Sequence, residues 1–210
     1  MDYRDLDLFM ACAQMNEQAC APIPEGFFIR SLRESELDIW KRIHFDKPQT
    51  AEEYQPYMEE WFEHHYAARR ALFFERCQVI CDSSDRVLGT CFWWEHEEVI
   101  PTLHWFKVIR EAEGQGLGRA LLTHVMRDIP KGMYPVYLHT QTSSMRAIKL
   151  YTDFGFALLD NPRLDERDNG LEESMETFAR HMTPQAFANL KVAHYDAGKI
   201  VPIKWEKRHE

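Results

Sequence analysis

Residues 113–122 read Glu-Gly-Gln-Gly-Leu-Gly-Arg-Ala-Leu-Leu, with glycines at three alternate positions directly before an apolar segment that favours a helix. Glycine adopts positive φ angles and carries no side chain, so successive backbone N–H groups can converge on one anion. A helix that begins near Leu117 adds its unpaired first-turn donors and the positive end of its dipole. Upstream, residues 102–108 are rich in β-branched and aromatic residues and predict a strand. The stretch therefore predicts a strand-to-helix corner that can bind a diphosphate.

Two better-known phosphate loops do not fit this corner. The Walker type needs Lys and then Ser or Thr after its last glycine, whereas Gly118 is followed by Arg119 and Ala120. The dinucleotide-binding fingerprint needs wider glycine spacing within a first βαβ unit, and this loop lies past the middle of the chain. A plain tight turn also accommodates alternate glycines, so that alternative stays open on this segment alone.

A second motif follows at residues 143–156, which read Ser-Ser-Met-Arg-Ala-Ile-Lys-Leu-Tyr-Thr-Asp-Phe-Gly-Phe. Together the two segments resemble the GNAT acyltransferase superfamily. Its cofactor loop is usually Arg/Gln-x-x-Gly-x-Gly/Ala, and a later helix reads roughly Asn-x-x-Ala-x-x-Leu-Tyr and ends in Gly-Phe. Gly116 and Gly118 match the loop glycines, with Gly114 as the additional one that many members carry. The second pattern is matched by Ala147, Leu150, Tyr151, Gly155 and Phe156.

The sequence departs from the family pattern at two positions. Glu113 stands where the family has Arg or Gln, and a carboxylate near a pyrophosphate opposes binding. The penalty is modest if the side chain points to water, because surface charge interactions are worth about 1 kcal/mol or less, and Arg110 and Arg119 lie close in the sequence. Ser144 stands where the family often has Asn, and a serine can still cap the following helix.

The resemblance implies an α/β fold in which a mixed, mostly antiparallel central sheet is flanked by helices on both faces. It covers about residues 27–181, and the specific motifs lie within 102–156. With 210 residues, 45% of them hydrophobic, the chain can bury the core of one domain. We expect a GNAT-like acetyltransferase domain over residues 26–182, an unassigned lead-in at 1–25, and a helix and strand extension packed on the same domain at 183–210.

Hydrophobic periodicity and turn residues predict the individual elements. Residues 5–18 allow an amphipathic helix that Pro22 and Pro24 would end. Thr50-Ala51-Glu52-Glu53 is typical of a capping box and predicts the start of a helix that carries the aromatic residues of 54–65. Thr183-Pro184 predicts a capped start with a proline in the first turn. Further helices are expected at 35–44, from Leu117 and over the second motif. Strands are expected at 27–30, 77–81, 87–94, 102–108, 136–140, 156–159, 174–181 and 199–205, the second and third forming a hairpin around 82–85.

Charge and cysteine content narrow the class of partner and compartment. Lys and Arg number 25 against 34 Asp and Glu, so the formal charge of −9 disfavours nucleic acid and anionic lipid and favours cationic partners. Ordinary solubility explains the same charge. The five cysteines form no Cys-x-x-Cys pair and no zinc spacing, and we expect Cys77 and Cys81 to point into a sheet as reduced thiols. Without a long apolar stretch or a secretory start, the sequence predicts a soluble cytoplasmic protein that needs no metal.

The resemblance also implies the reaction, which is transfer of an acetyl group from acetyl-CoA to a primary amine by direct attack in a ternary complex. Residues 114–118 would hold the pyrophosphate. The backbone of the preceding strand would pair with the pantetheine amides, at a place where the family has a bulge. Carried over residue by residue, cofactor contacts are expected at Phe106, Val108, Glu113, Gly114, Gln115, Gly116, Leu117, Gly118, Arg119, Ser144 and Ala147.

Acyl transfer to an amine needs a neutral nucleophile, stabilisation of the tetrahedral oxyanion and a proton for the departing thiolate. An alkylammonium with a pKa near 10.4 is only about one part in a thousand neutral at pH 7, so a base or a desolvating pocket helps. The family places a tyrosine of the Leu-Tyr pair near the sulfur, which makes Tyr151 the candidate acid. The alternative is core packing, since Tyr151 shares a helical stripe with Ala147, Leu150 and Phe154.

The candidate base is His104. Strand alternation places its side chain on the face of Phe106 and Val108 if no bulge intervenes, and an unperturbed pKa near 6.5 suits the task. A hydrogen-bonded core histidine is the alternative, and so is a water that relays to a carboxylate. The other titratable side chains near the expected cleft are Glu95, His96, Glu97 and Glu98.

Aromatic residues could line the pocket for the acceptor amine, although core packing is the other use for most of them. The acceptor would be a small amine or a peptide amine, and the protein a monomer or homodimer that binds neither nucleic acid nor membrane. The rival function is a non-catalytic domain that binds acyl-CoA as a sensor. The aromatic residues in question are Trp61, Phe62, Trp93, Trp94 and Trp105.

Overall fold

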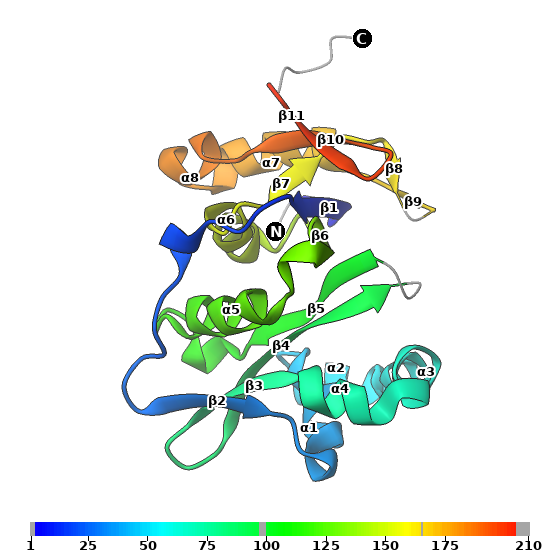
Figure 1. The fold of residues 1–210 in the computed structure, drawn as a ribbon, viewed down its shortest axis with the longest axis vertical. Coiled ribbons are helices and arrows are strands. Elements are labelled where there is room, and N and C mark those ends of the chain that lie inside the picture. The colour runs from blue at the N-terminus through cyan, green and yellow to red at the C-terminus, as the bar shows by residue number, and fades with distance from the viewer. Residues whose placement is uncertain (1–2, 97–99, 165, 205–210) are drawn as a thin grey trace. The chain divides into compact units, whose positions relative to one another are not determined.

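The computed structural model describes residues 3–96, 100–164 and 166–204, and they divide into two compact units (Figure 1). The first unit comprises residues 1–19, 95–102 and 130–210 within those limits, and the second comprises 20–94 and 103–129. The strand β5 (Ile100–Val108) contributes residues to both. Among the described residues, none of the helices combines the length and the apolar character needed to span a bilayer.

The second unit is built on strands whose hydrogen-bonded order is β5-β4-β3-β2. The β2–β3 and β3–β4 pairs are antiparallel, and the β3–β4 register shifts between Ile80 and Cys81. The strands are β2 (Phe27–Ser31), β3 (Gln78–Asp82), β4 (Val87–His96) and the second half of β5. The helices are α1 (Leu37–Ile43), α2 (Pro48–Glu53), α3 (Gln55–His65), α4 (Arg70–Arg76) and α5 (Leu117–Asp128).

Helices cover both faces of β3 and β4 in this unit. Val79 and Cys81 of β3 and Trp94 of β4 join a buried cluster with aromatic residues of α1, α3 and α4. On β4 the neighbouring Trp93 faces the other way, because its indole Nε1 donates to Asp128 Oδ2 of α5 at 3.1 Å. Successive strand residues point to opposite faces, so the sheet is buried on both sides.

The first unit is a second stretch of sheet, in the order β11-β10-β7-β1-β6. All its pairs are antiparallel except β10 with β7, and Thr102 of β5 pairs in parallel with Tyr137. The strands are β1 (Asp7–Cys12), β6 (Val136–Gln141), β7 (Ala157–Leu159), β10 (Val192–Asp196) and β11 (Lys199–Ile203). Helices α6 (Met145–Asp153), α7 (Leu171–His181) and α8 (Pro184–Ala188) and the small β8–β9 pair (Arg163–Leu164, Arg167–Asp168) complete it.

The expected fold class is confirmed: a large, mostly antiparallel sheet is flanked by helices (Figure 1). The predicted strands that begin at residues 27, 77, 87, 102, 136 and 156 are β2 to β7, and the one predicted from 199 is β11 as far as residue 203. The helix predicted from Thr183 is α8, and the Thr183 hydroxyl accepts from the Ala186 N–H at 3.2 Å as a cap should. Helix α4 and strand β10 have no counterpart among the predictions.

Two elements were assigned the wrong type. Residues 7–12, expected within a helix, are β1, which lies between β6 and β7 and buries five of its residues in succession. A strand covered on both faces has no alternation, so its apolar run cannot be told from a helix by periodicity. Residues 174–181, expected as a strand, belong to α7, whose buried Leu171, Ser174, Met175 and Phe178 follow helical spacing.

The capping box predicted at Thr50 is also wrong. Helix α2 begins earlier, with Pro48 in its first turn, so Thr50 lies inside it. The aromatic residues expected on that helix lie on α3, except Tyr54, which separates the two helices. Helix α3 begins at Gln55 with Pro56 in its own first turn. Proline is favoured in the first turn of a helix because its missing N–H would be unpaired there anyway.

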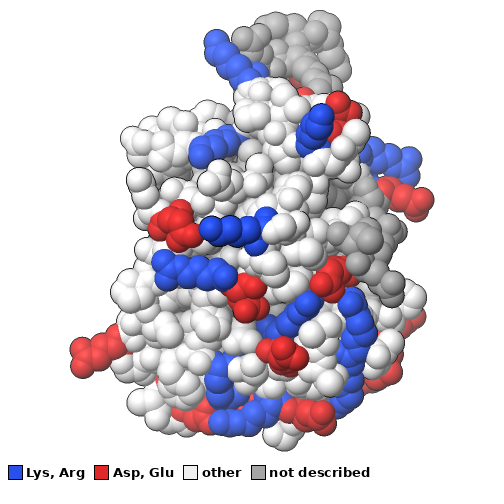
Figure 2. Space-filling model, in the orientation of Figure 1, with Lys and Arg blue, Asp and Glu red and all other residues white. Residues whose placement is uncertain are grey.

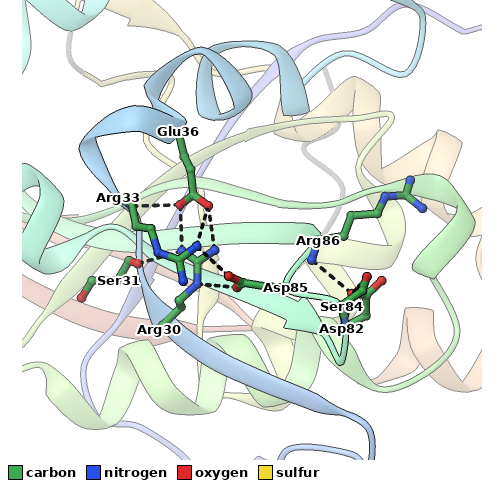
Figure 3. A network of polar contacts seen from close by, with 8 residues as sticks. All are labelled: Arg30, Ser31, Arg33, Glu36, Asp82, Ser84, Asp85 and Arg86. Atoms are coloured by element: carbon green, nitrogen blue, oxygen red, sulfur yellow. Dashed lines mark hydrogen bonds and ion pairs between the residues drawn. The ribbon is translucent and has the colours of Figure 1, made fainter.

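A network of charged side chains ties β2 to the turn between β3 and β4 (Figure 3). The Arg30 guanidinium donates to both carboxylate oxygens of Glu36 at 2.7 Å and, through Nε, to Asp85 at 2.8 Å. Arg33 completes it with a 2.6 Å contact to Asp85. The side chains of Arg30 and Glu36 are only 16% and 12% exposed, so their charges are screened little by solvent. The bonded guanidinium of Arg30 lowers the pKa of Glu36.

We expect Glu36→Gln to reduce the free energy of unfolding by about 1–3 kcal/mol near pH 7, since it removes one of the two carboxylates that pair with the Arg30 guanidinium. A carboxyl with a lowered folded-state pKa stabilises above its ordinary value of 4.5 and loses that contribution as the pH falls through the folded-state pKa. The difference between wild type and variant in urea unfolding should therefore shrink in acid.

The matched control is Glu34→Gln, because the Glu34 side chain is 69% exposed and lies 4.0 Å from Arg70. An exposed pair of this kind contributes about 1 kcal/mol or less. Equal losses in the two variants would contradict the special role of Glu36.

Candidate functional site

The corner between β5 and α5 is formed by two left-handed glycines. The end of β5 is held to β4 by a bond from the Ile109 N–H to the Leu88 carbonyl at 2.8 Å. A short 3-10 turn at residues 110–112 follows, and then Gly114 and Gly116 each adopt φ of +80°. Residues with a Cβ rarely adopt this conformation, so the chain turns here because these two positions are glycine.

The corner leaves the start of α5 without a side-chain cap. Gly116 is the N-cap residue, and the first backbone bond of the helix runs from the Ala120 N–H to the Gly116 carbonyl at 3.1 Å. The N–H groups of Leu117, Gly118 and Arg119 come before any helical acceptor. Such donors, together with the positive end of the helix dipole, favour an anion. The donor set therefore fits a phosphate group.

The surroundings of the corner are open on one side. A Cβ placed on Gly114 would meet no atom within 4 Å, whereas one on Gly116 would meet the Pro24 side chain at 3.7 Å. Glu113 and Arg110 are both exposed. Because solvent screens an exposed carboxylate, the departure from the family pattern at Glu113 carries a small electrostatic cost.

The charge of the molecule is not gathered into one patch on the face drawn in Figure 2. Lys and Arg side chains alternate there with Asp and Glu side chains. The formal charge of −9 therefore does not appear on this face as a continuous acidic surface that would select a cationic partner.

Strand β4 approaches β5 closely just before the corner. A Cβ on Gly89 would lie 2.7 Å from the Lys107 carbonyl oxygen and 3.1 Å from a Val108 methyl group. Glycine is thus required at position 89 by space, since a backbone oxygen cannot move aside as a side chain can. This approach fixes the end of β5 from which the glycine corner departs.

The alternation of β5 is interrupted at Trp105, whose φ of +52° is left-handed. As a result the neighbouring His104 and Trp105 point the same way: His104 Nδ1 and Trp105 Nε1 both reach the Tyr66 hydroxyl, at 2.6 and 3.0 Å. Val108 lies by contrast beside Ile80, on the other face. The expectation that His104 shares a face with Phe106 and Val108 applied to a strand without a bulge. The break at Trp105 removes that condition, and Val108 faces away from His104.

Tyr66, just after α3, was not singled out from the sequence. It is fully buried, and its ring contacts Phe73, Phe92 and Trp94 at centroid distances of 5.0 to 5.5 Å. Burial raises its pKa, so the phenol stays protonated. The only signal in the sequence is the density of aromatic residues around it, which does not mark one tyrosine above the others.

The aromatic residues considered for an acceptor pocket fall into three environments. Phe62 and Trp94 are buried in the core cluster of the second unit. Trp61 and Trp105 are half-buried at its edge. Trp93 does not join them, because it faces α5. Core packing is thus the observed use of Phe62, Trp93 and Trp94.

The remaining expected site residues lie in the first unit, on or before α6. Ser144 is the N-cap residue of α6, but its hydroxyl makes no capping bond, contrary to the expectation that it could cap the helix. Ala147 is half-buried. Tyr151 is 6% exposed and packs on Phe156 with ring centroids 5.8 Å apart.

The other titratable candidates are placed as follows. Glu95 is half-buried in β4, while Glu97, Glu98 and the side chain of His96 lie outside the described residues. No group of three or more His, Cys, Asp or Glu side chains suited to a metal ion occurs among the residues that the structure describes.

None of the five cysteines forms a disulfide. Cys77 and Cys81 are buried in the second unit, as expected, and burial raises their pKa values to about 12 and about 11. Thiols with pKa values this high remain protonated and unreactive near neutral pH. Cys77 and Cys81 therefore serve as core side chains.

Comparison with known proteins now places the chain in a family. Residues 37–156 match the acetyltransferase (GNAT) family, and this span is more than half of the chain. The chain belongs to that family. Comparison with curated proteins gives no match.

Solved structures support the fold. The chain is similar to a GCN5-related N-acetyltransferase from Sphaerobacter thermophilus, with 22% identity over 74% of this chain and 50% of that one and a TM-score of 0.51. It is also similar to a Drosophila melanogaster protein, with 19% identity over 73% of this chain and 48% of that one and a TM-score of 0.51. A tandem GNAT protein from the clavulanic acid biosynthesis pathway shows 11% identity over 72% of this chain and 49% of its own, with a TM-score of 0.52. The match thus spans about half the length of each of these structures.

Proposed function

We propose that this protein transfers an acetyl group from acetyl-CoA to a primary amine by direct attack in a ternary complex. Membership of the acetyltransferase (GNAT) family supports an acyl-CoA-dependent N-acetyltransferase in general. The observation that carries the proposal is the pair of left-handed glycines, Gly114 and Gly116, which leave the first turn of α5 uncapped. Backbone donors at a helix start are the chemistry that a pyrophosphate requires.

In the proposed complex, residues 113–116 and the first-turn N–H groups of 117–119 hold the pyrophosphate. The backbone of Phe106 and Val108 pairs with the pantetheine amides, and Ser144 and Ala147 of α6 complete the cofactor contacts. When bound, acetyl-CoA supplies the activated thioester. The protein supplies position and proton transfer.

Tyr151 is the proposed acid, whose phenol provides the proton that a departing thiolate needs. Its 6% exposure is compatible with a protected hydroxyl and equally with core packing, so only a functional test separates the two. His104 is the proposed second catalytic residue. Its hydrogen bond with Tyr66 fixes the orientation of the imidazole ring and occupies Nδ1, so only Nε2 can act on a substrate.

The acceptor is proposed to be a small amine or a peptide amine. Tyr54 and Tyr57 on the α2–α3 segment are 45% and 47% exposed, and ring faces of this kind bind ammonium groups. We further propose that the protein acts in the cytoplasm, where its five free thiols stay reduced, as a monomer or homodimer, without nucleic acid, membrane or metal. The alternative, a domain that binds acyl-CoA without catalysis, is favoured only by the departures at Glu113 and Ser144.

The function is tested by following free thiol release from acetyl-CoA in the presence of amines, polyamines and peptides. The proposal expects release that depends on both the protein and one class of amine. Binding of acetyl-CoA by calorimetry without release across the whole panel would support the non-catalytic domain instead. If the protein did not bind acetyl-CoA at all, both the acetyltransferase and the non-catalytic binding domain would be rejected.

Gly116→Ala should weaken acetyl-CoA binding about tenfold. The unbound corner can relax away from the left-handed φ, which costs a residue with a Cβ roughly 1–2 kcal/mol, and it must return to that conformation to bind. Space is not the cause, since the added methyl meets Pro24 only at the ordinary distance of 3.7 Å. The control is Gly132→Ala, where the added methyl meets nothing within 4 Å and φ is not left-handed. Calorimetry measures both, and equal affinities would argue against a role for the corner.

Tyr151→Phe should reduce kcat about a hundredfold and leave acetyl-CoA affinity nearly unchanged, because it removes only the proton donor. Tyr137→Phe in β6 is the matched control, since that ring packs on Tyr195. Thiol-release kinetics and calorimetry give the two quantities. A Tyr151→Phe protein with wild-type kcat would leave the tyrosine as a core residue.

A further inference from the structure

The hydroxyl group of Tyr66 is the meeting point of three ring nitrogens in the second unit. Trp105 Nε1 lies 3.0 Å from it, Trp61 Nε1 3.4 Å and His104 Nδ1 2.6 Å. Tyr66 has no exposed surface, so these contacts are made away from water. Buried polar groups of this kind are expected to satisfy one another.

The donors and acceptors in this group can be assigned by elimination. An indole Nε1–H only donates, and a phenol oxygen has two lone pairs and one hydrogen. Trp61 and Trp105 therefore occupy both lone pairs of the Tyr66 oxygen. The remaining hydrogen of the hydroxyl goes to the third partner, His104 Nδ1, which is also the shortest contact.

The opposite arrangement leaves a polar hydrogen unpaired. If His104 donated from Nδ1, the Tyr66 oxygen would receive three hydrogens and its own hydrogen would have no acceptor among the three rings. Loss of the phenol proton does not relieve this, because burial raises the pKa of Tyr66. His104 also packs against Phe92, with ring centroids 5.6 Å apart.

The backbone explains why the two strand residues can share one hydroxyl. The left-handed φ of Trp105 turns its side chain to the face of His104, so both rings approach Tyr66. Lys107, two residues further on, extends to the same side and contacts Asp46 Oδ1 at 2.6 Å. The interruption in β5 thus has a clear result, which is to bring both His104 and Trp105 to the Tyr66 hydroxyl.

We propose that Tyr66 is a positioning residue that fixes His104 as the neutral tautomer with its proton on Nε2, so that His104 serves acyl transfer as a hydrogen-bond donor and not as the general base. A neutral imidazole that accepts at Nδ1 carries its hydrogen at Nε2. Neither nitrogen is then available to take a proton from an ammonium, and whatever group meets Nε2 meets an N–H. The tautomer is argued from the hydrogen bonds of a protonated Tyr66 hydroxyl, and its use in acyl transfer rests on the proposed function.

The tautomer is tested first, without any substrate. In protein labelled with 15N-histidine, long-range 1H–15N spectra at about pH 8, above the ordinary imidazole pKa near 6.5, distinguish the two nitrogens. His104→Gln identifies the signal. We expect an unprotonated Nδ1 and a protonated Nε2, with mixing of the tautomers in Tyr66→Phe and no change in Tyr137→Phe. A protonated Nδ1 in the wild type would overturn the proposal.

The role in acyl transfer is tested by two amide substitutions. The Gln amide places N–H groups near the position of Nε2, whereas the shorter Asn amide places them near Nδ1, and neither amide is a base. A donor role predicts that kcat falls less than about tenfold in His104→Gln and about a hundredfold or more in His104→Asn. Equal losses, as expected for a general base, or no loss in either variant, would reject the donor role.

These readouts separate the inference from the function on which it rests. If the wild-type protein released no thiol with any amine, the proposed function would fail and the donor role with it. The histidine spectrum would still decide the tautomer. If thiol release were normal and Nδ1 were protonated, the function would stand and the assignment of His104 would fall.

Discussion

Two residues with left-handed backbone, separated by Gln115, form the constraint on which the candidate site depends. Because Gly114 and Gly116 both adopt φ of +80°, the chain leaves β5 and begins α5 without a side-chain hydrogen bond that caps the helix. In the proposed complex Glu113 is no obstacle, since binding by backbone amides does not need a cationic side chain at that position. Strand β4 fixes the end of β5, from which this corner departs, because Gly89 lies directly against the Lys107 carbonyl oxygen.

Trp105 is a third residue with left-handed backbone near the site, and unlike the other two it is not a glycine. A bulky residue holds such a conformation only where its surroundings over-determine it, and such residues gather at functional sites. Here the surroundings are the bond from its indole to the Tyr66 hydroxyl and ring contacts with Trp40 and His44 at 5.7 and 4.6 Å. The result is a histidine whose hydrogen-bonding pattern is determined by the packed core behind it.

Local patterns were enough to predict the glycine corner, the second motif and most strands, because each depends on residues close together in the sequence. Prediction failed where tertiary packing decides. Residues 7–12 form a strand buried on both faces, and their apolar run looks the same in a helix. Alternation assumes extended backbone throughout a strand, so it cannot predict the break at Trp105. Tyr66 belongs to no sequence motif, so the sequence did not mark it as a partner of His104. The corner could therefore be read from the sequence, while the partners of His104 could not.

The position of β1 has a consequence for biosynthesis. Its residues emerge from the ribosome among the first of those described, yet Asp7 pairs with Gln141 and Met10 with Leu158. Pairing across such a separation is slow, and the apolar segment Leu8–Cys12 stays without its partners until most of the chain has been translated. Nascent chains of this protein should depend on a holding chaperone at that segment more than at the hairpin of β3 and β4, which closes as soon as it is made.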